Sequence, residues 1–437
     1  MELVIAFFLL LILLVVGIPV PFAFAAPVIL LSVSLGYEPS FLFPTAYTKL
    51  SGVVLLAIPL FILAGGIMEK GKIGDHLVGF IDLFFGRVKG SLAIISVVAS
   101  AVFGSICGSG AATLSCIGSI LAPKMRENKY PMGIAASVLC CSAPLGLLIP
   151  PSAIQILYAW SGQLSILACF LSTVLPGIML TILLSVGSWI MLRKSTGLAL
   201  NPRIEKKDMG RVVIKRTKSA VPALLMPFII LGGIYGGFMT PTEAAAVSVI
   251  YAIPVAMYIY RGINLNGLKN TFIETATTTG VIMAMLALIM MLSRILLMED
   301  VPDKLMTLLL FVSDNPIIIM LMINVFMVII GMIMDDVSGT LLITPLLLPI
   351  VMDIGISPYH FAAILGVNLG MGNITPPTAP FMYLGGRICN VNTSEMIKPC
   401  LFLICFAYIP TLLVTTYVPA MATFLPELIL GGNYSSL

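Results

Sequence analysis

The chain has 437 residues, of which 59% are hydrophobic and 10% are charged, and its formal net charge is +4. A soluble domain carries about 25% charged residues, so this composition leaves too little polar surface for a soluble protein. Residues 131–192 contain no Lys, Arg, Asp or Glu. That stretch is long enough for two membrane crossings, because one helical crossing needs about 20 apolar residues. The composition predicts a multi-pass membrane protein.

The first predicted element, residues 2–16, is a continuous run of apolar side chains. Only helices and closed barrels satisfy backbone groups in lipid, and barrel strands alternate between apolar and polar residues. The continuous run therefore favours an all-α protein. Glu2 is the only charge in the segment, and no small-residue cleavage site follows closely. We expect a mature helix rather than a signal peptide.

The uncharged stretch 90–123 contains the segment GSICGSGAAT at 104–113. Closely spaced glycines interrupt a helix, and small side chains let another backbone approach. We predict the tip of a re-entrant helical hairpin that spans about 91–123. Such backbone is tolerated at membrane depth only where it lines a cavity or is buried in protein. A close helix–helix packing seam is the alternative interpretation of these small residues.

Tandem prolines interrupt the next apolar segment, PLGLLIPPS at 144–152. Proline has no N–H, so it leaves backbone carbonyls of the preceding turn without their usual donors. Gly146 and Ile149 would then present free oxygens. The segment NLGMGNITPPT at 368–378 repeats this pattern, and there Gly372 and Thr375 hold the corresponding places. Both segments are predicted to be broken helices.

A basic segment at 193–218 separates two hydrophobic halves, 1–192 and 219–437. It holds nine of the 23 basic residues: Arg193, Lys194, Arg203, Lys206, Lys207, Arg211, Lys215, Arg216 and Lys218. Basic loops stay on the cytoplasmic side, so we predict a cytoplasmic loop here. Because the basic residues cluster in this loop between membrane segments, we expect no nucleic-acid partner from the net charge of +4.

The two halves repeat each other at a constant offset of 226 residues. The offset superimposes four positions: Pro123 on Pro349, Gly146 on Gly372, Pro150 on Pro376 and Pro151 on Pro377. Self-similarity at a fixed spacing indicates an internal repeat. The segment after Pro123 carries three basic residues and one acidic residue, whereas the segment after Pro349 carries only Asp353. Opposite loop charge indicates that the repeats are inverted.

The second repeat contains the counterpart of the glycine-rich tip, GMIMDDVSGT at 331–340. Asp335 and Asp336 lie there between uncharged runs, and Asp335 aligns with Ser109 at the offset of 226. We predict a second re-entrant hairpin over about 315–352. Charge inside a membrane is costly and usually functional, although an exposed loop is the alternative. Opposed tips and broken helices form ion sites in many transporters, because carbonyls suit a cation and helix N-termini suit a carboxylate.

With these motifs in view, the chain resembles the large membrane subunit of the tripartite ATP-independent periplasmic (TRAP) transporters. The resemblance rests on IPLFILAGG (58–66), GSICGSGAAT (104–113), LGLLIPPS (145–152), GGIYGGFMTPTEAAA (232–246) and VNLGMGNITPP (367–377). It implies an elevator-type transporter in a bacterial inner membrane, with uptake of a C4-dicarboxylate, sialic acid or a related carboxylate coupled to Na+. It also implies two partners, a small four-helix membrane subunit (Q type) and a periplasmic substrate-binding protein (P type).

The resemblance also implies two Na+ sites. The first would use Cys107, Ser109, Gly146, Ile149 and Pro151, and the second would use Gly331, Asp335, Gly372, Thr375 and Pro377. The family often has two or three serines in the first tip, where this chain has Cys107. A thiol is a poor Na+ ligand, so Cys107 would offer only its carbonyl. The organic anion is expected between the tips, near Ser109 and Asn368.

Three other functions remain open at this stage. A Na+/carboxylate symporter that needs no binding protein would share the same architecture, and an anion channel would share the hairpins. An intramembrane aspartyl protease could use Asp335, but the long uncharged runs offer few candidates for the second acid that it needs. There is also no HExxH motif and no phosphate-binding GxxxxGK[ST] loop. We therefore expect a transporter rather than an enzyme.

Overall fold

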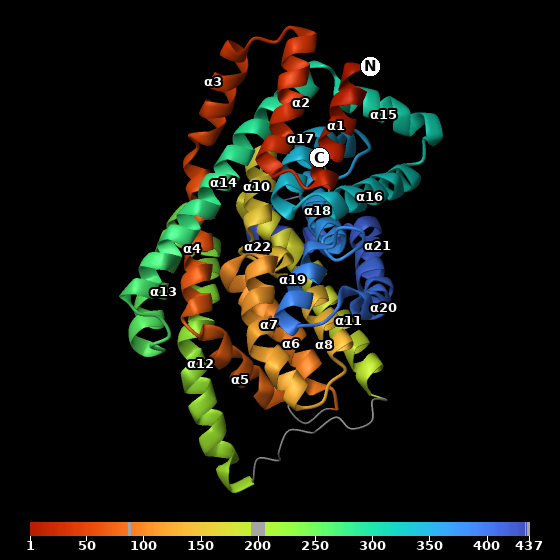
Figure 1. The fold of residues 1–437 in the computed structure, drawn as a ribbon. Helices are drawn as coiled ribbons and strands as arrows, with labels where there is room; N and C mark the ends of the chain where they lie inside the picture. Colours follow the sequence, from red (N-terminus) through yellow and green to blue (C-terminus); the bar gives the residue numbers. More distant parts are fainter. Residues whose placement is uncertain (86–88, 194–205, 433, 435–437) are drawn as a thin grey trace.

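A computed structural model describes residues 1–85, 89–193, 206–432 and 434, and within these ranges all regular structure is helical. The first half contains α1 (Glu2–Val16), α2 (Val20–Leu35), α3 (Pro39–Leu50), η1 (Val53–Leu56), α4 (Ala57–Lys70), α5 (Ile73–Phe85), α6 (Ser91–Cys107), α7 (Gly110–Glu127), α8 (Met132–Ser142), α9 (Leu145–Leu148), α10 (Ala153–Gly162) and α11 (Ile166–Leu192). The predicted all-α membrane fold is confirmed (Figure 1).

The second half begins after the basic segment. It contains α12 (Lys206–Tyr235), α13 (Pro241–Pro254), η2 (Val255–Ile259), α14 (Leu265–Met298), α15 (Val301–Val312), α16 (Pro316–Ile333), α17 (Asp336–Asp353), α18 (Pro358–Gly372), α19 (Pro380–Cys389), α20 (Thr393–Leu403), η3 (Ile404–Tyr408), α21 (Ile409–Tyr417) and α22 (Ala420–Leu430). Among the described residues, eight helices are long and apolar enough to cross a membrane.

Both predicted hairpins are present, and they match at the offset of 226. Helix α7 covers 110–127 and α17 covers 336–353, so both ends of α17 lie 226 residues after those of α7. Helix α7 continues past Pro123 to Glu127, further than the predicted end of the hairpin. Lys and Arg are good helix formers and interact favourably with a helix C-terminus, which accounts for the additional turn. The hairpin α6–α7 lies in the lower part of Figure 1 and α16–α17 in the upper part, as inverted repeats require.

Each repeat packs its hairpin against its own broken helix and against that of the other repeat. Helix α6 contacts α8 and α9, and α16 contacts α18. Across the repeats, α7 packs on α19 and α17 packs on α10, a reciprocal exchange. The buried core of the protein therefore lies where the two hairpins and the two broken helices meet.

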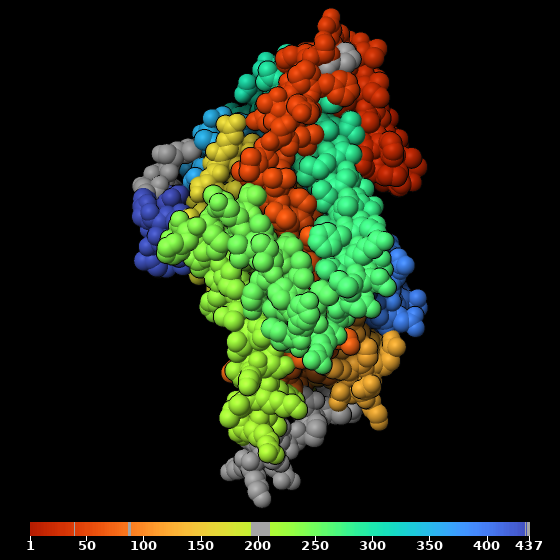
Figure 2. Space-filling view, turned by 90° about the vertical axis from the view of Figure 1, so that its left-hand side faces the viewer, coloured from red at the N-terminus to blue at the C-terminus, as the bar shows by residue number. Residues whose placement is uncertain are grey.

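A second group of helices packs mainly on itself. Helix α4 lies against α13 and α14, α2 and α3 lie against α14, and α12 lies against α13. Figure 2 shows α12, α13 and α14 in green, with the orange and red N-terminal segments beside them, covering one face of the molecule. This group, α1–α4 with α12–α14, is called the scaffold below. Large apolar side chains point outward from it, among them Phe8, Phe228 and Ile250, as lipid contact requires.

The basic segment differs from the predicted loop. Residues 194–205 lie outside the described residues, but α12 begins at Lys206, so Arg211, Lys215 and Lys218 lie on a helix. The contacts of Arg216 give a physical reason why this part of the basic segment is helical. Its guanidinium donates to the carboxylate of Asp82 at 2.7 Å and to the carbonyl of Gly79 at 3.1 Å, both on α5. These contacts tie the basic end of α12 to an amphipathic helix of the first repeat.

Candidate functional site

The first hairpin turns over two residues between α6 and α7. Gly108 adopts a left-handed conformation with φ of 62°, which favours glycine. A Cβ atom at Gly108 would also lie 2.8 Å from the carbonyl oxygen of Pro151. Ser109 caps α7, and its Oγ accepts a 3.5 Å hydrogen bond from the N–H of Ala112. The tip therefore lies directly against the first broken helix.

Polar atoms gather beneath this tip. The hydroxyl of Thr113 donates to the carbonyl oxygen of Ser109 at 2.8 Å and lies 3.2 Å from the sulfur of buried Cys107. Gly146 faces this group, because a Cβ there would lie 2.7 Å from Thr113 Oγ1 and 2.9 Å from the Ser109 oxygen. The absence of a side chain at Gly146 thus leaves room at the oxygens of the tip.

The first broken helix ends at Ile149 and resumes at Ala153. The N–H of Ala153 donates to the carbonyl of Gly108 at 3.3 Å, so the start of α10 is bonded to the hairpin tip. Ser152, the N-cap of α10, is fully buried, and its Oγ has no hydrogen-bond partner among the described residues. The same is true of Gln155 Oε1 one turn later. Buried polar atoms are normally satisfied, so these two indicate a place where a ligand or water can bind.

The second hairpin tip has the same plan with a charged cap. Asp335 caps α17, and its Oδ2 accepts a 3.2 Å bond from the N–H of Val337. Its Oδ1 accepts a bond from the hydroxyl of Ser338. Gly331 lies against the second broken helix, because a Cβ at Gly372 would fall 2.5 Å from the carbonyl carbon of Gly331. Two glycines thus let hairpin and broken helix meet backbone to backbone.

The second break holds its own unpartnered polar atoms. Asn373 is 1% exposed, and neither amide atom of its side chain has a hydrogen-bond partner among the described residues. Thr378 Oγ1 is likewise without a partner, and it lies 226 residues after Ser152. Thr375 instead donates to the carbonyl of Met371 at 2.6 Å, and Pro377 is exposed. The orphan hydroxyl after the tandem prolines is therefore a shared feature of both repeats.

Asn368 lies on α18 one turn before the break and is fully buried. Its Nδ2 donates to Asn324 Oδ1 at 2.9 Å and to the carbonyl of Ile364 at 2.8 Å, while its Oδ1 has no partner among the described residues. Asn324, on α16, donates in turn to Thr416 Oγ1 at 3.0 Å. No hydrogen bond joins Asn368 to Ser109, so the two residues predicted to bind the anion belong to separate polar groups.

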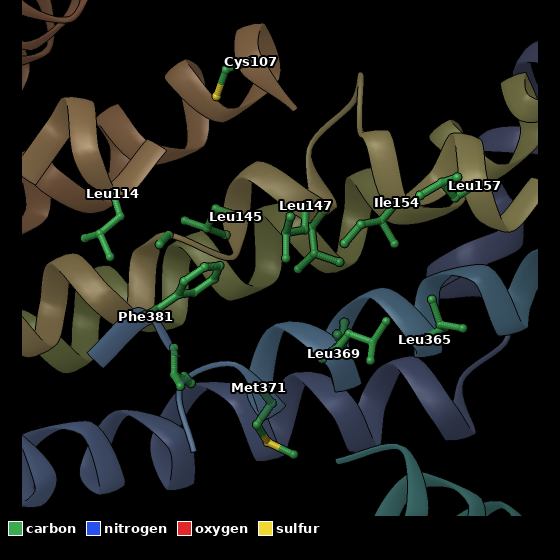
Figure 3. Close-up of a cluster of buried hydrophobic side chains, with 14 of the residues drawn as sticks. Cys107, Leu114, Leu145, Leu147, Ile154, Leu157, Leu365, Leu369, Met371 and Phe381 are labelled. Atoms are coloured by element: carbon green, nitrogen blue, oxygen red, sulfur yellow. The ribbon is translucent and has the colours of Figure 1, made fainter. Parts of the chain in front are cut away.

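Apolar side chains surround these polar atoms. Figure 3 shows Leu145 and Leu147 on the first broken helix and Leu369 and Met371 on the second, with Cys107 at the end of α6. All five are at most 6% exposed. In such a low-dielectric setting an unpaired polar atom is costly, and an ion that pairs with it is held strongly.

The chemistry of these atoms fits a hard cation better than a transition metal. In the described ranges, no cluster of three or more His, Cys, Asp or Glu side chains is placed to hold a metal ion. The two junctions instead offer carbonyls, hydroxyls, amides and the carboxylate of Asp335, and oxygen ligands of this kind suit hard cations. The N-termini of α7, α10 and α17 lie at the same junctions, and helix N-termini favour anions.

Sequence reasoning brought the right segments together but missed several polar residues. Ser109 and Gly331 lie against the broken helices, and Asp335 caps the return arm of the second hairpin. The polar residues Thr113, Ser152, Asn324, Asn373 and Thr378 were not singled out. The offset of 226 gives one signal that could have found two of them, since it places Ser152 on Thr378. Asn324 and Asn373 have no polar counterpart at that offset.

Comparison with known proteins identifies the family. Residues 7–421 match the family described as "Tripartite ATP-independent periplasmic transporter, DctM component". The chain belongs to this family. It is therefore the large permease subunit of a TRAP transporter.

Two relatives and one solved structure extend this result. The chain is 32% identical to the C4-dicarboxylate TRAP transporter large permease protein DctM of Pseudomonas aeruginosa, over 85% of this chain and 86% of that protein. It is 32% identical to the isethionate TRAP transporter permease protein DctMQ of Oleidesulfovibrio alaskensis, over 94% of this chain and 64% of that protein. The YdaH transporter of Alcanivorax borkumensis has the same fold, with a TM-score of 0.61 at 15% identity over 91% of each chain.

Proposed function

We propose that this TRAP large permease takes up small organic anions by Na+-coupled secondary active transport. The observation that carries the proposal is the pair of equivalent junctions, each with a hairpin tip, a broken helix and a buried hydroxyl without a partner, at Ser152 and Thr378. Broken helices and opposed tips that offer free oxygens are how many membrane transporters hold coupling ions.

The first proposed Na+ site uses the carbonyls of the first tip and break. Cys107 contributes its carbonyl only, since a thiol is a poor ligand for Na+. Ser109 contributes its carbonyl, which already accepts from Thr113, or its hydroxyl. Gly146, Ile149 and Pro151 complete the set. The Pro151 oxygen supports this assignment because it lies closest to where a Cβ at Gly108 would be, 2.8 Å away.

The second proposed Na+ site has a carboxylate beside it. It uses Gly331, Asp335, Gly372, Thr375 and Pro377. The close backbone approach of Gly331 and Gly372 supports it, as does the buried amide of Asn373 one residue further. Asp335 brings negative charge that the first site lacks, so the second site is expected to bind Na+ more tightly.

The anion is proposed to lie between Ser109 and Asn368. The two side chains belong to opposite repeats. A carboxylate between them would accept from the Ser109 hydroxyl and from Asn368 Nδ2, which would release its present bond to Asn324 to donate to the anion. Helix N-termini at both tips favour its negative charge. C4-dicarboxylates and sialic acid are the proposed substrates; a C4-dicarboxylate permease is among the relatives, and the isethionate permease transports another small organic acid anion by its name.

Energy for accumulation would come from the Na+ gradient. Each Na+ that enters gains about 2.3 kcal/mol per 100 mV of membrane potential, before any concentration difference is counted. Two ions per anion would therefore offset the cost of moving a charged substrate inward. This supports strong uptake without ATP.

Movement is proposed to follow an elevator mechanism in the bacterial inner membrane. The hairpins and broken helices form one packed group, and the scaffold forms another. Sliding the first group past the second would expose the junctions to each side of the membrane in turn. The packing of the scaffold helices on one another supports this arrangement, with α14 against α17 as one of the surfaces that would slide.

Two partners are proposed, a small four-helix Q-type membrane subunit and a periplasmic P-type substrate-binding protein. The isethionate permease named DctMQ supports the first, because this chain covers only 64% of its length. A self-sufficient Na+/carboxylate symporter is the competing function, since the fold alone would serve it equally well.

Uptake in proteoliposomes tests the proposal. The permease is reconstituted with its small subunit, a Na+ gradient is imposed, and radiolabelled carboxylates are offered with and without the binding protein. Accumulation that needs both Na+ and the binding protein is expected. Accumulation without the binding protein would establish the self-sufficient symporter, and flux that never exceeds equilibrium would establish a channel.

A further inference from the structure

A half-enclosed apolar cavity lies between the scaffold and the second hairpin. Its volume is about 400 Å³. The lining comes from α1, α2 and α14 on the scaffold side, from α15, and from both arms of the hairpin α16–α17. Figure 1 shows α1, α15, α16 and α17 gathered in the same upper region of the molecule. The proposed Na+ and anion residues do not line it.

The side chains that line the cavity determine which kind of molecule can occupy it. Apart from Lys304, every lining residue is apolar, and Leu10, Leu31 and Leu342 are at most 4% exposed. A cavity of this kind excludes water and takes up apolar molecules instead. Val4 and Leu308 line it while remaining 58% and 62% exposed, so the cavity is open to the surroundings of the protein. Around a membrane helix, those surroundings are lipid.

The single basic residue of the lining, Lys304, indicates that the occupant carries a polar head group. Lys304 lies one turn into α15, beside the α14–α15 connection, and its amine donates to the carbonyl of Glu299 at 2.6 Å. Lysine side chains near helix ends place their charge at the membrane surface while their methylene stems lie along apolar surface. Glu299, Asp300 and Asp303 lie beside Lys304 in the sequence, so a zwitterionic head group complements this end, with its phosphate at the Lys304 ammonium and its own amine toward the acidic residues.

We propose that this cavity binds a phospholipid, with one acyl chain between α1 and the second hairpin and its phosphate beside Lys304. The equivalent place in the first repeat is closed. There a Cβ at Gly65 of α4 would lie 2.8 Å from Cys107 Cβ, and a Cβ at Gly74 of α5 would lie 2.6 Å from the sulfur of Cys116. The lipid therefore fills a space that the first repeat closes by packing the glycine backbone of α4 and α5 directly on the hairpin.

The consequence for transport rests on the proposed function. If the hairpins move past the scaffold, they slide over the surface that the acyl chain occupies. The lipid can be exchanged during this movement and still fill the space between the two groups of helices. The binding of the lipid itself needs neither Na+ nor substrate. The two claims can therefore fail separately.

Photochemical labelling tests the site. The permease and its small subunit are reconstituted in vesicles of phosphatidylethanolamine and phosphatidylglycerol that contain phosphatidylethanolamine with a diazirine in mid-chain. After irradiation without Na+ or substrate, labelled peptides are mapped by mass spectrometry. Labels are expected on the cavity-facing residues of α1, α15 and α17. Ala6→Phe, which fills the cavity, should reduce them at least about tenfold, because the chain loses its place.

Matched variants separate the cavity from the outer surface. Ile12→Phe adds an aromatic ring to α1 at a position 57% exposed and outside the cavity, so its labelling should be unchanged. Lys304→Gln should reduce labelling about fivefold, because the phosphate of the probe lipid loses its partner. Should Ala6→Phe fail to fold, Leu305→Phe fills the same cavity from α15. Unchanged labelling in the filled variant, no label on cavity residues, or a crosslink of these residues to the small subunit would overturn the proposal.

Discussion

The two hairpin junctions share one plan but differ in charge. Ser109 and Asp335 stand 226 residues apart and cap the return arms of their hairpins in the same way. The first cap is a neutral hydroxyl at 3.5 Å from its donor, whereas the second is a carboxylate with bonds from Val337 and Ser338. The two tips therefore share a backbone plan and differ in the chemistry of the capping side chain.

The junctions differ in packing as well. In the first repeat, glycines bring α4 and α5 against the hairpin, and Gly104 lies against the backbone of Gly146. In the second repeat, a cavity of about 400 Å³ separates α1 from the hairpin. The comparison teaches that both junctions bring hairpin and broken helix into backbone contact, while the second repeat adds a carboxylate at its tip and a cavity beside its hairpin. The following predictions test that difference, beginning with the largest effect.

Restoring the helix at either break should abolish uptake. In the double variant Pro376→Ala, Pro377→Ala, the chain regains two N–H groups and α18 can continue into α19, which removes the free carbonyls. The same holds for Pro150→Ala, Pro151→Ala. Uptake in proteoliposomes is expected to fall by more than about 100-fold in both. Pro399→Ala, inside α20 and away from the breaks, is the matched control and should transport normally.

Equal loss in both double variants would show that the two breaks are equally necessary. Normal uptake by either one would contradict the assignment of that break to an ion site. Folding is checked by gel filtration and by thermal unfolding in detergent, so a misfolded variant is not mistaken for an inactive one.

Adding one methyl group should have different effects at Gly104 and at Gly331, because the space around these two helix positions differs. A Cβ in Gly104→Ala would lie 2.5 Å from Gly146 Cα, and backbone cannot move aside cheaply. We expect a loss of about 1–3 kcal/mol of stability. In Gly331→Ala the nearest atom is 3.2 Å away, so the strain is smaller. Both glycines lie inside helices, so a helix-propensity gain of about 1 kcal/mol applies to both variants and offsets the strain only at Gly331. Thermal unfolding midpoints measure both; a Gly331→Ala loss as large as that of Gly104→Ala would contradict the packing difference.

Removing the charge at the second tip should weaken Na+ binding. Asn is as good an N-cap as Asp, so Asp335→Asn keeps the helix start and changes only the charge. Hydrogen bonds and contacts to a charged group are more favourable in free energy than those to a neutral group by about 1.4 kcal/mol. Losing this free energy should raise the Na+ concentration for half-maximal uptake about tenfold. The Na+ dependence of the initial uptake rate measures this. An unchanged half-maximal concentration would remove Asp335 from the site.

The smallest effect is expected at the first tip. Ser109→Ala removes a hydroxyl whose bond to Ala112 is long, while the carbonyl of residue 109 remains in place. Because a weak cap contributes about 0.5 kcal/mol, the Na+ concentration for half-maximal uptake should rise only about two- to threefold. A shift as large as that of Asp335→Asn would show that the Ser109 hydroxyl is itself a ligand.

Much of this fold could be predicted from the sequence because prolines and glycines, which have special backbone properties, recur at the same offset in both halves. Proline restricts the backbone and glycine permits conformations and close approaches that other residues avoid, so their repetition at an offset of 226 indicates the repetition of structure. Long uncharged runs fix the membrane class independently. The hairpin arms and both breaks followed from these two signals.

The remaining features depend on tertiary contacts that no local pattern reveals. Asn324 and Asn368 are joined by a hydrogen bond between two helices. The side-chain amide of Asn373 is cut off from solvent by the surrounding helices and has no hydrogen-bond partner among the described residues. The predicted basic loop is partly helix, since Arg216 finds its partners on α5, far away in sequence. The apolar cavity consists of residues from six helices, each of which is ordinary in a membrane protein.

The ratio of Na+ to anion carried is the most direct test of the two-site assignment. Initial rates of radioactive Na+ and radiolabelled anion entry are measured in the same proteoliposomes, for the wild-type permease and for Asp335→Asn at subsaturating Na+. At least two Na+ per anion are expected in the wild type, with a lower ratio in the variant as the second site empties. Anion entry at an unchanged rate without Na+ would contradict Na+ coupling at these junctions altogether.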